Sequence, residues 1–105
     1  AEVMICHDSP DGGTQAVQDI INIPPHMSMW SEAGLRYARE GREMMNQAYA
    51  IVDPVLFIHG HYHVGDYRED HDRRHRFLSL NLDGLPDNVA VLDTDTLEVE
   101  INREY

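Results

Sequence analysis

The chain has 105 residues, 42% of them hydrophobic, and carries 19 acidic against 8 basic side chains, a formal net charge of -11. This length suits one small core, so we expect residues 1–105 to form a single domain. The longest apolar runs, VLFI and VAVL, fall far short of the roughly 20 residues that span a bilayer, and the acidic charge disfavours direct nucleic-acid binding, so neither a membrane nor a nucleic acid is an expected partner.

The N-terminal half predicts one strand and two helices. Residues 2–6, EVMIC, favour a strand that ends in the turn-rich sequence HDSPDGG. Residues 14–21 predict a short helix capped by Thr14, and residues 31–52 a longer one. We expect Trp30, just before the long helix, to be a core or hydrophobic-staple residue rather than a platform on which bases stack. One stripe of the long helix should pack on the sheet, with Leu35, Ala38, Met45, Ala48, Tyr49 and Val52.

The C-terminal half predicts strands. Pro54 ends the long helix, and residues 55–58 form a continuous apolar strand, typical of one buried on both faces. Residues 65–76 are expected to be a charged loop, FLSLNLDG begins an alternating strand at Phe77, and residues 88–102 fold back as a hairpin. This order predicts a parallel crossover followed by an antiparallel meander, so the fold class is α/β or mixed α+β.

The side chains available for chemistry are restricted. The single cysteine, Cys6, allows no internal disulfide and is typical of a reducing compartment, so we expect a cytoplasmic protein. All eight basic residues are arginines, which excludes phosphate-loop and Schiff-base lysines from this chain.

Four histidines follow predicted strands. His59, His61 and His63 alternate after residues 55–58, and in an extended segment alternate side chains point to one side, as metal ligation would require. A chance cluster at an exposed strand end explains the triplet equally well. His7, however, follows the first strand, and ligands of open α/β sheets bind at the carboxyl ends of strands. We therefore expect His7 to converge with His61 and His63.

Two blocks of the sequence resemble a known family. ICHDSP, followed after a helical segment by DPVLFIHGHYHVGD, resembles the last two signature blocks of the calcineurin-like metallophosphoesterases, here His7 and then Gly60-His61-Tyr62-His63. The strands FLSLNLDG and VAVLDTDTLEV are similar to those that close the family's second sheet, so the resemblance covers nearly the whole chain. It implies the C-terminal half of a four-layer αββα sandwich.

The resemblance also implies a two-metal site. His7 and His61 would bind one metal and His63 the other, with Mn²⁺ expected first and Fe, Zn, Ni or Co as alternatives. Metal-bound hydroxide would then hydrolyse a phosphomonoester or phosphodiester.

The earlier family blocks, Asp-x-His, Gly-Asp and Gly-Asn-His, which carry the remaining ligands, are absent, and the only Gly-Asp pair follows the histidines. This chain therefore holds half of a site. We expect it to be inactive or nearly so alone, with the missing N-terminal half or a second copy as its structural partner and a phosphate ester as substrate of the complete protein.

Five further residues are candidates for contacts behind the ligands or with substrate: Asp8, His59, Tyr62, Arg73 and Arg74. Asp8 is a loop residue that could orient a ligand histidine. Arg73 and Arg74 could reach a substrate phosphate, although a solvated face paired with neighbouring aspartates is the favoured interpretation. The alternative function is a non-catalytic metal-binding or self-associating interaction module.

Overall fold

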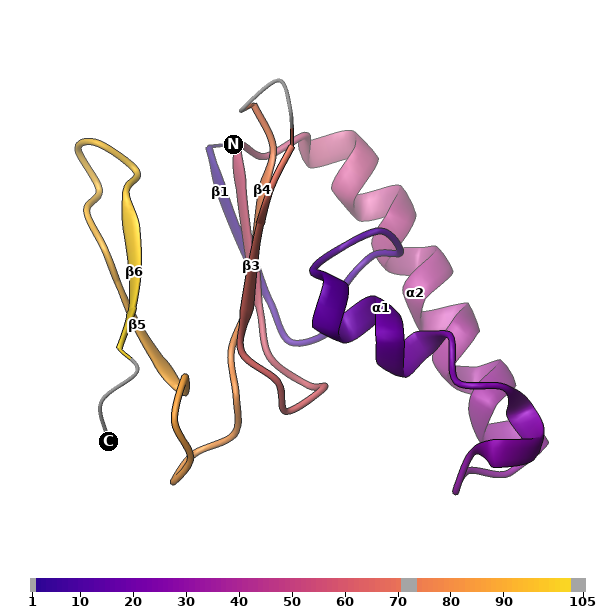
Figure 1. Ribbon diagram of the computed structural model, residues 1–105. Helices are drawn as coiled ribbons and strands as arrows, with labels where there is room; N and C mark the ends of the chain where they lie inside the picture. Colours follow the sequence, from indigo (N-terminus) through magenta and orange to yellow (C-terminus); the bar gives the residue numbers. More distant parts are fainter. Residues whose placement is uncertain (1, 71–73, 103–105) are drawn as a thin grey trace.

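The computed structural model describes residues 2–70 and 74–102. The elements are β1 (Val3–Cys6), α1 (Gln15–Ile21), a 3-10 turn η1 (Pro25–Met27), α2 (Glu32–Val52), β2 (Leu56–His59), β3 (Asp66–Glu69), β4 (Arg76–Ser79), β5 (Val89–Leu92) and β6 (Val99–Asn102). One sheet has the strand order β1-β2-β4-β3, and β5 and β6 form a separate hairpin. The helices lie on one side of the sheet and the hairpin on the other (Figure 1). The predicted mixed α+β class is confirmed.

The pairing of the strands decides where their ends lie. β1 and β4 both pair with β2 in parallel, and β3 pairs with β4 antiparallel. Phe57 consequently lies between Met4 on β1 and Phe77 on β4. Because β1 and β2 run the same way, the residues that follow them emerge at one edge of the sheet.

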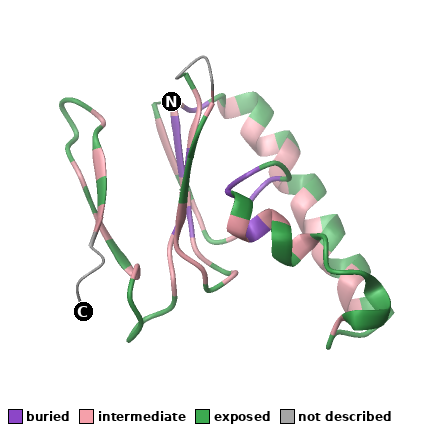
Figure 2. Cartoon of the chain, viewed as in Figure 1, coloured by how far each residue is buried: buried purple, intermediate pink, exposed green. Residues whose placement is uncertain are grey.

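The core occupies both faces of β2 and β4. On the helix side, the ring of Tyr49 from α2 lies 5.7 Å from that of Phe57 and 5.4 Å from that of Phe77. On the other side, Leu56 and Leu78 are fully buried. Figure 2 shows buried residues along these central strands and in the segment around the start of α1. Each such apolar side chain contributes about 1.5–3 kcal/mol by leaving water.

Helix α2 has a well-defined start and end. The Ser31 hydroxyl accepts a hydrogen bond from the backbone N–H of Gly34, and Asp53 ends the helix with a left-handed backbone, φ 47°. The predicted apolar stripe is only half-buried, and no residue of α2 is fully buried. Trp30 is 73% exposed, so the prediction that it packs in the core or as a staple is wrong. None of the helices in the described ranges is both long and apolar enough to cross a membrane.

Three local predictions are corrected by the structure. The expected charged loop contains β3, because DYRE can pair with β4 while its side chains stay in or near solvent. β4 pairs with β2 in parallel, so it does not belong only to an antiparallel meander. Phe77, Leu78 and Ser79 are buried in succession rather than alternating, because β4 is covered on both faces.

Candidate functional site

His7 and His61 meet at the edge of the sheet where β1 and β2 end. The last paired residues are Cys6 and His59, and the Gly60 N–H then donates to the His7 carbonyl at 3.2 Å. The His61 Nδ1 and His7 Nε2 atoms are 2.9 Å apart. The ring centroids lie 4.8 Å apart with the planes at 74°. The two parallel strand ends therefore bring together imidazoles 54 positions apart in the sequence.

The chain turns sharply at His61. The Tyr62 N–H donates to the Gly60 carbonyl at 2.9 Å, and His61 between them has a φ of 72°, which describes a γ-turn of the rare positive-φ kind. His63 also has a positive φ, 60°. β2 ends at His59, so the prediction of an extended segment with three histidines on one side is wrong. Such a backbone costs about 1–3 kcal/mol per residue and is typical of functional sites.

His59 belongs to the core rather than to the histidine pair. It is 2% exposed, and its Nδ1 lies 2.8 Å from the Gly60 carbonyl oxygen, to which it can donate as the neutral Nδ1–H tautomer. Among the described residues no hydrogen-bond partner of its Nε2 is found. Burial lowers the pKa of the His59 imidazole. A neutral ring is therefore favoured at this position.

Asp8 holds Tyr62 rather than a histidine. The Tyr62 hydroxyl donates to Asp8 Oδ1 at 3.1 Å, and the same oxygen accepts the Ser9 N–H at 2.8 Å. Burial raises the pKa of the Tyr62 phenol, the negative charge of Asp8 adds to this effect, and the Arg42 guanidinium opposes it. Because Tyr62 lies between His61 and His63, its contact with Asp8 fixes the histidine turn to the loop after β1.

Helix α2 supports that loop from behind. Arg42 Nε lies 3.1 Å from Asp11 Oδ1, and Asn46 both donates to Asp11 Oδ2 and accepts from the Asp11 N–H. A Cβ on Gly41 would lie 3.4 Å from Asp8 Oδ2, so the small residue allows a close approach. These contacts were not predicted from the sequence. The available signal was the four-residue spacing of Arg42 and Asn46, which places them on one face of the helix.

The remaining predicted site residues do not join the pair. His63 is exposed, and within residues 2–70 and 74–102 its ring makes no hydrogen bond and no aromatic contact. Arg74 pairs with Asp53 at 3.0 Å, at the start of β2 and thus at the opposite end of that strand from His61. Arg73 lies outside the described residues.

The histidine pair fits part of a metal site. Two imidazole nitrogens that bind one ion at about 2.1 Å lie about 3.0 Å apart at right angles and about 3.4 Å apart in the tetrahedral arrangement of zinc. The His7 and His61 nitrogens lie 2.9 Å apart, near the first value, and this is also the length of a hydrogen bond between the two rings. Over the described ranges, however, no three His, Cys, Asp or Glu side chains are grouped closely enough to hold a metal. The pair can thus supply two ligands of one ion, and further ligands are required.

Comparisons of the chain with protein-family models, with curated proteins and with solved structures find no match. The resemblance to the metallophosphoesterases accordingly stays a prediction that rests on the two histidine blocks.

Proposed function

We propose that this chain supplies the metal-binding C-terminal part of a binuclear, calcineurin-like metallophosphoesterase. The observation that carries the proposal is the contact between His7 and His61, which follow two neighbouring parallel strands. Imidazoles at strand ends are common metal ligands, and the carboxyl edge of an α/β sheet is the usual ligand-binding position. The sheet with helices on one side and a β-hairpin on the other would form half of a four-layer sandwich.

In this proposal His7 and His61 hold one ion, and His63 belongs to the second. Bound divalent ions would polarise the phosphate ester and lower the pKa of a water molecule. The chain's own residues position the ligands. The Tyr62–Asp8 hydrogen bond anchors the turn that carries His61, and the Gly60–His7 backbone hydrogen bond joins the two strand ends.

The described residues do not provide a complete site. Two neighbouring cations require carboxylate or hydroxide bridges to offset their repulsion, and within residues 2–70 and 74–102 no carboxylate is hydrogen-bonded to His7 or His61. The phosphoesterase would therefore need ligands from a further segment or another chain. We expect the 105-residue chain alone to bind one divalent ion weakly and to have negligible activity.

Calorimetric titration with Mn²⁺ or Zn²⁺ tests the proposal. We expect one weak site in the unmodified chain that is lost in both His7→Ala and His61→Ala. His26→Ala is the matched control, because His26 lies on the exposed turn η1. Ion binding unchanged by both site variants, or vigorous Mn²⁺-dependent hydrolysis of a bis-aryl phosphate by the isolated chain, would contradict it.

A second candidate is a self-associating module. β1 is an outer strand of the four-stranded sheet, and its Ile5 side chain is 71% exposed. An outer strand with unpaired backbone groups can pair with another chain. If this is its role, Ile5→Lys should convert a dimer into a monomer in light scattering and leave ion binding intact. A monomeric unmodified chain at high concentration excludes this candidate.

A further inference from the structure

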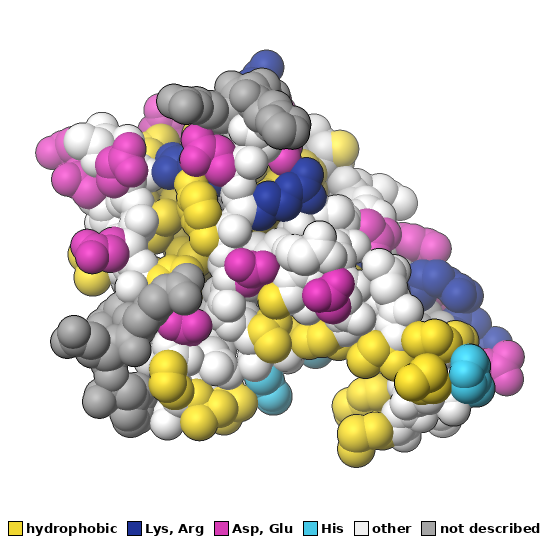
Figure 3. Space-filling view, in the orientation of Figure 1, with side chains coloured by type: hydrophobic (Ala, Val, Ile, Leu, Met, Phe, Trp, Pro, Cys, Tyr) yellow, Lys and Arg dark blue, Asp and Glu magenta, His cyan; other side chains and the backbone are white. Residues whose placement is uncertain are grey.

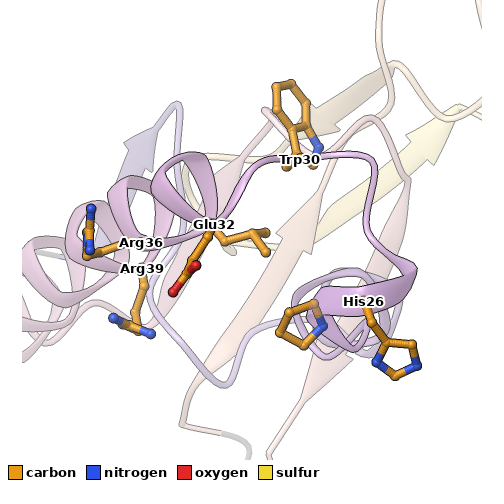
Figure 4. A pocket seen from close by; sticks show the side chains of 7 residues that line it. His26, Trp30, Glu32, Arg36 and Arg39 are labelled. Carbon is orange, nitrogen blue, oxygen red and sulfur yellow. The ribbon is translucent and has the colours of Figure 1, made fainter.

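A cleft with basic and aromatic lining lies where η1 meets the start of α2. Its volume is about 500 Å³, within the range of about 300–1,000 Å³ of small-ligand pockets. It is lined by Pro25, His26, Trp30, Glu32, Leu35, Arg36 and Arg39. Figure 4 shows Glu32, Arg36 and Arg39 along the first turns of α2, His26 on η1, and Trp30 at the bend between them. None of these residues belongs to the histidine pair or its supporting contacts.

Arg36 and Arg39 carry positive charges that no acidic side chain of the described residues pairs with. They are three positions apart and so lie on adjoining parts of the α2 surface, and Figure 4 shows their guanidinium groups on different sides of the helix. Neither forms an ion pair within the described ranges, whereas Arg42, Arg68 and Arg74 each pair with an aspartate. Even Glu32, one turn before Arg36, is not paired with it.

Trp30 adds a flat apolar surface to the same cleft. Its side chain is 73% exposed, and the neighbouring Met29 is 98% exposed. Figure 3 shows apolar side chains gathered at this end of the molecule, beside a histidine and basic groups. An indole that does not pack on its own protein can stack on a planar ligand, a contact worth about 1–3 kcal/mol per base.

We propose that this cleft binds a planar aromatic ligand that carries a phosphate group, of the size of a nucleoside monophosphate. The exposed side chains of Arg36 and Arg39 turn toward the cleft and bind the phosphate, because guanidinium groups match its oxygens in charge and geometry. Trp30 stacks on the ring. This site goes beyond the proposed metal site, shares no residue with it, and requires no metal ion.

The chain contains a built-in reporter, because Trp30 is its only tryptophan. Titration with AMP in the presence of EDTA should quench its fluorescence saturably below about 1 mM. The double variant Arg36→Ala/Arg39→Ala should weaken binding by about tenfold or more, because charge-assisted contacts are lost. Arg74→Ala, which removes an arginine paired elsewhere with Asp53, is the matched control and should bind like the unmodified chain.

Titrations with adenosine alone and with inorganic phosphate alone test the contributions of the ring and of the phosphate to binding separately. Each should bind at least about tenfold more weakly than AMP if both the arginines and the tryptophan contribute. The proposal would be overturned if adenosine bound as tightly as AMP, or if the affinity for AMP were unchanged in the double variant. His61→Ala should still bind AMP, so failure of the metal site and failure of this cleft are distinguishable.

Discussion

Replacing Tyr62 by phenylalanine removes a single hydroxyl group that ties the histidine turn to the loop after β1. In the structure this hydroxyl donates to Asp8 Oδ1 at 3.1 Å, and both side chains are half-buried. A hydrogen bond to a charged acceptor contributes about 1.5–3 kcal/mol, and partial exposure places this one at the lower end. We expect Tyr62→Phe to lower the free energy of unfolding by about 1.5 kcal/mol.

Urea unfolding followed by far-ultraviolet circular dichroism measures this change. With a slope of about 1 kcal/mol per molar urea, as in small proteins, the midpoint should fall by about 1.5 M. Asp8→Ala should cost more than Tyr62→Phe, because Asp8 also accepts the Ser9 N–H. The double variant should be about 1 kcal/mol more stable than the sum of the single effects predicts. Additive effects, or an unchanged midpoint in Tyr62→Phe, would refute the assigned role of this contact.

Three further changes test the packing and the charges. Gly65→Ala should destabilise the chain by about 1–3 kcal/mol in the same urea assay. The reason is that a Cβ at position 65 would overlap the Asp87 side chain and would lie 3.0 Å from its carboxylate oxygen Oδ2. An unchanged unfolding midpoint would contradict this packing. The hydrogen bond between His75 and Asp53 lowers the pKa of the Asp53 carboxyl group. The stability that this hydrogen bond gives the folded chain is therefore present above the ordinary pKa of 3.8, and it is lost as the pH falls through the lower pKa of the folded state. Asp53→Asn, which keeps a residue tolerant of the left-handed backbone, should therefore be less stable than the unmodified chain at pH 6 and equal to it at strongly acidic pH, and a difference that persists there would exclude this cause. Ser31→Ala should cost about 1 kcal/mol of thermal stability by removing the N-cap of α2, and no shift in the melting temperature would argue against the cap.

The sequence predicted those parts of the fold that local patterns determine. The long helix was expected from Ser31 to Val52, and the structure begins it one residue later with Ser31 as its cap. The apolar run after Pro54 became β2, shifted by one residue, and the C-terminal hairpin formed as expected. These elements have strong caps, breakers or apolar runs within their own sequence.

Long-range contacts account for what the sequence did not predict. β3 is formed by DYRE, which has little apolar character of its own and is a strand because β4 pairs with it. The left-handed backbone of His61 and His63 has only a slight signature in their residue type, because few histidines adopt a positive φ although the residue is enriched there, and glycine is the residue that usually marks such positions. Within the candidate site, the meeting of His7 and His61 was predictable from two parallel strands, whereas the contact of Asp8 with Tyr62 depends on the turn.

The separation of His7 and His61 by 54 positions has a consequence for how the chain acquires its histidine pair. The unfolded chain would have to close a loop that includes both helices before the two rings could meet, so the pair exists only after the crossover has docked. An ion that engages both rings would consequently prefer the native state. At a hundredfold excess over its dissociation constant, the ion would raise the free energy of unfolding by about 2.7 kcal/mol. A rise in the melting temperature on addition of divalent ions would therefore report that His7 and His61 are held together in the folded chain.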